Sequence, residues 1–126
     1  MTVQYLHTKL RVRDLDAAIR FYETAFGYAV RSRRPGPAES EIAFLTLPDQ
    51  TAEIQLAHYP DGTTFEVPAR MTHLAFKVDD LAAVHARALA AGAKPATGPY
   101  TLPSGSIVAF IQDPNGYDLE LVQKPH

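Results

Sequence analysis

The sequence predicts an α+β fold in which two βαβββ modules follow each other and their mixed sheets curl around a shared hollow. The first observation is an internal repeat: residues 7–16 align with residues 73–82 at an offset of 66 positions (73 minus 7), and both segments begin with histidine. The second is that each half has a strand-like alternation followed by a helical pattern. The third is a glycine directly after each helical pattern, at Gly27 and Gly92.

The 126 residues are enough for one domain of ordinary size. We expect modules at about 1–60 and 71–126, with a connector at 60–70. A half of this length does not bury a sheet face well alone, so the two halves are predicted to share one domain.

In the first module, apolar and polar residues alternate from position 6 to position 13, which is the period of a half-buried strand. Asp14 is an N-cap candidate for a helix from Leu15 to Phe26, and Gly27 suits a left-handed C-cap. The rest of the module is predicted as strands at 28–33, 42–47 and 51–57, a Pro-Gly loop at 35–38 and a turn at 48–50.

The second module repeats this order. A strand is expected at 72–78, and Asp79 or Asp80 would cap an alanine-rich helix that reaches Ala91 and ends at Gly92. The rest is predicted as a weak strand at 94–97, a loop that holds Gly98-Pro99 and 103–105, strands at 106–112 and 117–123, and a turn at 113–116 that joins them.

Composition excludes several classes of function. The formal net charge is -2, so no general attraction to nucleic acid or anionic membrane is expected. The chain contains no cysteine, which removes disulfides, thiolate metal ligands and a cysteine nucleophile. No apolar run approaches the roughly 20 residues of a membrane span, and no signal peptide is evident. We therefore expect a soluble cytoplasmic protein.

Strand alternation places the chemically useful side chains on one face of each predicted sheet. The side chains expected to pack on the helices are Leu6, Leu10, Val12, Leu74, Phe76 and Val78. The opposite faces are expected to carry the donors His7, Gln55, His73 and Glu120, together with the cations Lys9, Arg11 and Lys77. If the sheets curl around one hollow, these side chains converge there.

Two imidazoles, one amide and one carboxylate suit a borderline divalent ion such as Ni²⁺, Co²⁺, Zn²⁺ or Mn²⁺. Donor distances should be about 2.0–2.2 Å, with one or two positions left for water or substrate. Taken alone, His7 or His73 is more often an ordinary strand histidine, and Glu120 could be the solvent face of an edge strand. The repeat and the shared face favour a metal site. The other histidines, His58, His85 and His126, are expected to be structural or surface residues.

Three segments resemble the vicinal oxygen chelate superfamily, whose fold is built from paired βαβββ modules. They are residues 6–15 (LHTKLRVRDL), 72–78 (THLAFKV) and 109–121 (AFIQDPNGYDLEL). The last segment is typical of the superfamily as a whole. The first resembles glyoxalase I (lactoylglutathione lyase) of the short bacterial type more narrowly.

The resemblance implies a metal held by His7, Gln55, His73 and Glu120, and a reaction that isomerises the hemithioacetal of methylglyoxal and glutathione to lactoylglutathione. By analogy, Glu120 removes the proton alpha to the carbonyl. Arg11 matches a position that meets a carboxylate of glutathione in this family. The resemblance also implies a homodimer whose site forms within one chain or across two.

Two departures keep other substrates open. The short bacterial glyoxalases usually have glutamate where this chain has Gln55, and often asparagine where it has Tyr59. The donor set also resembles that of methylmalonyl-CoA epimerase, a family that uses a second base. In this chain, Glu39 or Glu41 could supply that base. An extradiol dioxygenase or a thiol transferase would need only the two histidines and Glu120. A metal-free binding protein of the bleomycin-resistance type is the remaining alternative.

Overall fold

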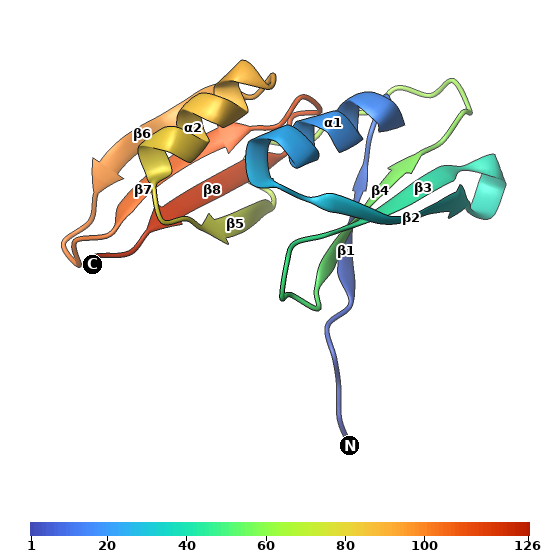
Figure 1. Ribbon diagram of the computed structural model, residues 1–126. Helices are drawn as coiled ribbons and strands as arrows, with labels where there is room; N and C mark the ends of the chain where they lie inside the picture. Colours follow the sequence, from blue (N-terminus) through green and yellow to red (C-terminus); the bar gives the residue numbers. More distant parts are fainter. The chain divides into compact units, whose positions relative to one another are not determined.

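The computed structural model describes residues 1–126 and divides them into two compact units, residues 1–64 and 65–126. Each unit is one βαβββ module with a single four-stranded sheet and one main helix (Figure 1). The predicted α+β class and the predicted module order are therefore confirmed. No helix is both long enough and apolar enough to cross a membrane.

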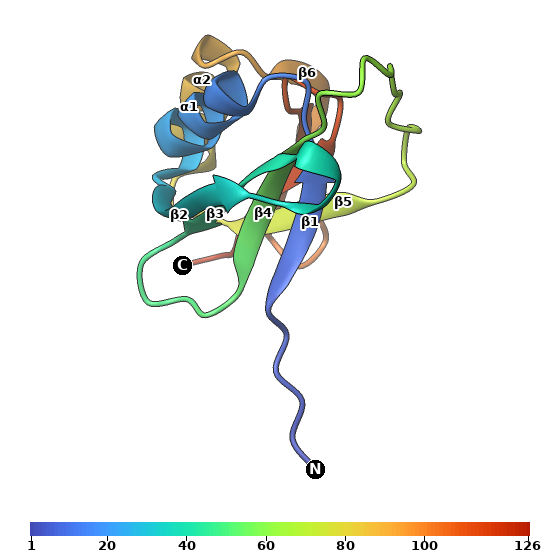
Figure 2. The same cartoon turned by 90° about the vertical axis from the view of Figure 1, so that its right-hand side faces the viewer.

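The first unit builds its sheet in the order β1-β4-β3-β2, with β1 parallel to β4 and the other neighbours antiparallel. Its elements are β1 (His7–Arg11), α1 (Leu15–Phe26), β2 (Ala29–Pro35), the short 3-10 helix η1 (Pro37–Glu39), β3 (Glu41–Thr46) and β4 (Glu53–His58). Helix α1 packs on β3 and β4 and covers one face of the sheet (Figures 1 and 2). No helix of the unit covers the other face.

The second unit repeats this topology in the order β5-β8-β7-β6, with β5 parallel to β8. Its elements are β5 (His73–Lys77), α2 (Leu81–Ala90), β6 (Lys94–Thr101), β7 (Ile107–Gln112) and β8 (Asp118–Gln123). Helix α2 packs on β7 and β8, again on one face only. In both units, the first and last strands of the module form a parallel pair. The internal repeat of the sequence aligns this pair in one unit with the pair in the other.

Both helices begin with an aspartate cap. The Ala17 N–H donates to Asp14 Oδ1 at 3.0 Å, and the Ala83 N–H donates to Asp80 Oδ1 at 3.1 Å. The structure thus selects Asp80 over Asp79. Gly27 ends α1 in the left-handed conformation with φ 80°, as predicted, because a residue without a Cβ adopts that conformation at little cost.

The duplicated caps give a matched stability prediction. Asp14→Ala and Asp80→Ala should each lower the free energy of unfolding by about 1 kcal/mol, because each leaves a helix N–H without its acceptor. Asp79→Ala is the control and should change it by less than about 0.5 kcal/mol. Urea denaturation measures all three, and an effect of Asp79→Ala equal to that of Asp80→Ala would contradict the assignment.

Buried apolar side chains fill the space between each helix and its sheet. In the first unit they include Phe21 and Tyr22 on α1 and Leu45 and Leu56 on the strands, all 2% exposed or less. The Phe21 and Tyr22 rings pack edge to face with centroids 5.0 Å apart. In the second unit Leu119 and Leu121 of β8 are fully buried. This packing leaves the alternate residues of the same strands pointing away from the helix.

Several details differ from the sequence prediction. Leu6 does not pack on the helix but is 62% exposed, because it lies in the N-terminal segment that extends away from the sheet before β1 begins (Figure 2). Strand β6 continues through Gly98-Pro99 to Thr101, where a loop was expected. Register shifts against β7 on both sides of Thr97 absorb this irregular stretch within the sheet. Helix α2 ends at Ala90 with Ala91 as its C-cap, one residue before the expected end at Ala91.

Candidate metal and substrate site

The first pair of predicted donors, His7 and Gln55, lies on the two parallel strands of the first unit. Lys9 of β1 is in register with Gln55 of β4, and His7 is two residues before Lys9. Residues two apart on a strand share a face, so His7 and Gln55 lie on the same face, one residue pair apart. Leu10 and Leu56 are buried on the helix side. The donors therefore occupy the face that α1 leaves open, as predicted.

The second pair, His73 and Glu120, is in contact within the second unit. Glu120 of β8 is in register with Ala75 of β5, two residues after His73. The His73 Nε2 atom lies 3.3 Å from Glu120 Oε1. The side chains are 47% and 22% exposed, respectively, so both remain open to a ligand. One nitrogen and one oxygen donor are thus already side by side.

A phenylalanine, not predicted from the sequence, accompanies each donor pair in the structure. Phe44 of β3 is in register with Gln55, and its ring meets the His7 ring edge-on at a centroid distance of 5.3 Å. Phe110 of β7 is in register with Glu120, and its ring meets His73 edge-on at 5.4 Å. The two phenylalanines are 66 positions apart (110 minus 44), which equals the spacing of the histidines. That shared offset was the signal in the sequence.

The phenylalanine rings restrict the imidazoles. A ring packed edge-on against a histidine limits how the imidazole can turn, and it excludes water from one side. His7 is partly buried in this way, whereas His73 is more open. Each unit therefore holds the same trio of an imidazole, an oxygen-bearing side chain and a phenylalanine on its helix-free face.

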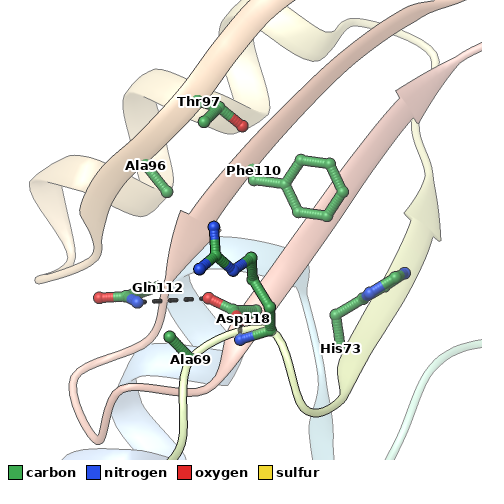
Figure 3. A pocket seen from close by; sticks show the side chains of 8 residues that line it. Ala69, His73, Ala96, Thr97, Phe110, Gln112 and Asp118 are labelled. Atoms are coloured by element: carbon green, nitrogen blue, oxygen red, sulfur yellow. Dashed lines mark hydrogen bonds between the residues drawn. The ribbon is translucent and has the colours of Figure 1, made fainter.

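A pocket of about 530 Å³ lies beside His73 in the second unit (Figure 3). Its lining consists of Ala69, Arg70, His73, Ala96, Thr97, Phe110, Gln112 and Asp118. The Arg70 backbone N–H donates to Asp118 Oδ2 at 2.9 Å, and Gln112 Nε2 donates to Asp118 Oδ1 at 3.3 Å. Arg70 also has a left-handed backbone with φ 61°, which a residue with a Cβ rarely adopts. The backbone of Arg70 is thereby fixed at this pocket.

Arg11 lies on the same face as His7 and Gln55, as predicted, but its guanidinium is engaged. Arg11 Nη2 donates to Thr63 Oγ1 at 2.7 Å and to Asp61 Oδ1 at 3.2 Å. Hydrogen bonds from Thr63 and the charge of Arg11 lower the pKa of Asp61. This carboxylate therefore stays ionised and paired.

The remaining polar candidates separate by strand parity. Lys77 is exposed at the end of β5, on the face that carries His73. His58 of β4 lies on the opposite face of the sheet from Gln55. Its Nδ1 atom lies 3.3 Å from the Val12 carbonyl oxygen. The structure thus gives His58 a backbone partner, in keeping with a structural role.

The donors fit a metal in kind. Each unit carries one imidazole nitrogen and one side-chain oxygen on its helix-free face. The structure contains no group of three or more His, Asp or Glu side chains that could hold a metal ion. Imidazole, amide and carboxylate donors suit Ni²⁺, Co²⁺, Zn²⁺ or Mn²⁺ rather than Ca²⁺.

The sequence also matches a known protein family. The family is the glyoxalase/bleomycin resistance protein/dioxygenase superfamily, and the match covers residues 4–121. The chain belongs to this superfamily.

Individual relatives show which members of the superfamily the chain resembles. Lactoylglutathione lyase of Haemophilus influenzae is 33% identical over 125 residues, which are 96% of this chain and 93% of that protein. A probable lactoylglutathione lyase of Vibrio parahaemolyticus is 34% identical over 122 residues, 94% of this chain and 88% of that protein. The chain is therefore a lactoylglutathione-lyase-like member of the superfamily.

A solved structure agrees with this placement. Glyoxalase I from Zea mays superimposes with a TM-score of 0.83 and 29% identity over 98% of this chain. This chain spans 45% of the length of the maize enzyme. The likeness confirms the α+β glyoxalase fold.

Proposed function

We propose that this protein is a metal-dependent isomerase of the glyoxalase I type, which converts the hemithioacetal of methylglyoxal and glutathione to lactoylglutathione. The observation that carries the proposal is the repeated trio on the two helix-free faces, and above all the contact of 3.3 Å between His73 Nε2 and Glu120 Oε1. The relatives named lactoylglutathione lyase support the reaction class.

The metal ligands in this proposal are His7, Gln55, His73 and Glu120. A bound Ni²⁺, Co²⁺, Zn²⁺ or Mn²⁺ would supply Lewis acidity at the two substrate oxygens. With Glu120 as the single anionic ligand, the centre keeps a net positive charge, which favours an anionic substrate form. The phenylalanine next to each histidine holds the imidazole in a fixed orientation.

Glu120 is the proposed general base. Its carboxylate takes the proton from the carbon that bears the hydroxyl and the sulfur and returns it to the neighbouring carbon, which had been the ketone. The hydroxyl proton passes to the former ketone oxygen, so that the first carbon becomes the thioester carbonyl. The reaction is an isomerisation, so no oxidant or co-reactant is consumed. A carboxylate beside a cationic centre is suited to this step, because the developing negative charge is stabilised where it forms.

The substrate site in this proposal includes the pocket beside His73. Arg70 supplies a cation there, and Phe110 supplies an apolar wall. Arg11 and Lys77 are the other proposed substrate contacts, and glutathione is the proposed co-substrate. We also propose that the protein works as a homodimer in the cytoplasm.

The direct test is the formation of lactoylglutathione from the preformed hemithioacetal, monitored by ultraviolet absorbance. The protein is first stripped of metal and then reloaded with one metal at a time. We expect turnover with at least one of Ni²⁺, Co²⁺, Zn²⁺ and Mn²⁺ and none in the metal-free protein. Turnover that is absent with all four metals would reject the proposed reaction.

Gln55 offers a further prediction. Gln55→Glu adds a second carboxylate to the proposed ligand set and should strengthen metal binding roughly tenfold or more, because affinity for a cation rises with ligand charge. Gln50→Glu adds the same charge in the exposed turn before β4 and should leave metal affinity unchanged. Competition with a chromophoric chelator measures both variants, and equal affinities would remove Gln55 from the ligand set.

A further inference from the structure

Asp118 carries a carboxylate that the proposed reaction leaves unused, although it lies close to the proposed donors. It is the first residue of β8, in register with His73 of β5 and with Gln112 of β7. Residues two apart on a strand share a face, so Asp118 lies on the same helix-free face as Glu120.

The two units use the carboxylate at this position differently. Glu53, the first residue of β4, is in register with His7 and so is the counterpart of Asp118 in the first unit. Both oxygens of Glu53 accept hydrogen bonds from the Arg31 side chain, at 2.5 and 2.9 Å, so that contact stays within the sheet. Asp118 instead reaches outside its sheet, to the backbone of the connector that precedes β5.

The Asp118 carboxylate ties this connector to β7. The Arg70 N–H donates to Oδ2 at 2.9 Å, and Gln112 Nε2 donates to Oδ1 at 3.3 Å (Figure 3). Hydrogen bonds to an ionised acceptor are roughly twice as strong as those between neutral groups. The connector also passes the turn between β7 and β8, where a Cβ at Gly116 would lie 3.8 Å from the Cβ of Val67.

The turn that Asp118 holds has few other constraints. Residues 68–71 are exposed, so burial contributes little to fixing them. The hydrogen bond within the turn, from the Met71 N–H to the Pro68 carbonyl oxygen, is long at 3.5 Å. Arg70 has a left-handed backbone with φ 61°, which is unfavourable for a residue with a Cβ. Such a conformation persists only where its surroundings enforce it, and the hydrogen bond to Asp118 supplies that constraint.

The same turn forms one wall of the pocket beside His73. Ala69 and Arg70 line the pocket from the turn, whereas Phe110 of β7 and Thr97 of β6 line it from the sheet. If the turn moved away, the pocket would lose this wall, and a ligand would have to order the turn on binding. Ordering a loop on binding lowers affinity.

We propose that Asp118 is a positioning residue, which holds the turn at residues 68–71 as a preformed wall of the substrate pocket. It moves no proton and binds no metal. Its effect is therefore on substrate affinity rather than on the chemical step. The proposal rests on the proposed function only in taking this pocket as part of the substrate site.

Amide hydrogen exchange, followed by NMR on the full protein, tests the hydrogen bond itself. Asp118→Ala should make the Arg70 amide exchange about tenfold faster, while the amide of the buried Leu121 on the same strand stays within about twofold of the parent. Asp118→Asn should keep exchange at Arg70 slow, because the asparagine oxygen still accepts the N–H. Asp79→Ala removes an exposed charge outside the pocket and should alter neither amide.

Steady-state kinetics then tests the wall. Asp118→Ala should raise KM about tenfold and leave kcat within about twofold, whereas Asp118→Asn should keep both near the parent values. Arg70→Pro breaks the same contact from the other side, since proline has no N–H and cannot adopt φ 61°. Compared with Arg70→Ala, it should raise KM about tenfold, and adding Asp118→Ala to it should raise KM no further.

Three results would overturn the inference. One is an Arg70 amide that exchanges equally fast in the parent and Asp118→Ala proteins. The second is an unchanged KM in Asp118→Ala. The third is a further rise in KM of about tenfold when Asp118→Ala is added to Arg70→Pro, which would show that the carboxylate contacts the substrate directly.

Failure of the proposed reaction is separate, because it appears as absent turnover in a parent protein whose Arg70 amide is still protected by Asp118. Calorimetric titration with S-hexylglutathione then replaces KM, and the same variants should weaken its binding in the same pattern. A parent protein that does not bind this ligand would also overturn the inference.

Discussion

Glu120→Gln is expected to lower kcat about a thousandfold while the protein remains folded, because an amide cannot accept the substrate proton. The side chains are nearly equal in size, and Glu120 is 22% exposed, so little packing is disturbed. Stopped-flow absorbance with the preformed hemithioacetal measures kcat, and thermal denaturation checks the fold. A general base typically contributes 10²- to 10⁴-fold, so the predicted loss is roughly in the middle of that range.

Glu66→Gln is the matched control for this substitution. Glu66 is exposed in the segment before β5, and its replacement should leave kcat within about twofold of the parent value. A Glu120→Gln protein that retains more than about a tenth of the parent kcat would show that another group removes the proton.

The second large effect is expected from the histidines. His7→Ala and His73→Ala should each weaken metal binding by at least about 100-fold, because each removes a ligand rather than a supporting contact. The two losses should be similar, although the residues belong to different units, since each unit supplies one imidazole to the same proposed centre. Atomic emission analysis after dialysis at a fixed free-metal concentration measures the bound metal.

His126→Ala controls for nonspecific binding of metal by histidine. His126 is the exposed C-terminal residue, and its loss should leave the bound metal at the parent level. If His7→Ala retains full metal content while His73→Ala loses it, the first unit is not part of the centre. Gln55 would then be a bystander, and the alternatives that need fewer ligands would regain support.

The fold could be predicted from the sequence wherever local signals and periodicity agree. Asp14 and Gly27 mark the ends of the first helix correctly, because capping depends on a few neighbouring residues. The alternation of apolar and polar residues on β1 and β5 also assigns His7 and His73 correctly to the helix-free faces, because it too is a pattern of neighbouring residues. Asp113 was placed correctly in a turn, where its carboxylate accepts the N–H groups of Asn115 and Tyr117 at 2.9 Å.

Features that depend on strand register were not predicted from the sequence, although the shared offset of Phe44 and Phe110 was visible in it. Phe44 and Phe110 sit on central strands, and only the pairing with β4 and β8 brings them beside the oxygen donors. The ion pair between Arg31 and Glu53 joins β2 to β4 across an intervening strand, at a bulge that the sequence pattern does not reveal. Leu6 was assigned to the core because alternation continues past the point where pairing stops.

Anomalous X-ray diffraction from crystals grown with Ni²⁺ tests most directly whether two imidazoles, one amide and one carboxylate hold the same ion. We predict one strong anomalous peak per chain, about 2.0–2.2 Å from a ring nitrogen of His7 and of His73 and from a side-chain oxygen of Gln55 and of Glu120. These four residues could belong to one chain or to two. A peak bound elsewhere, or imidazoles more than about 6 Å from the Glu120 carboxylate in every subunit combination, would contradict the account.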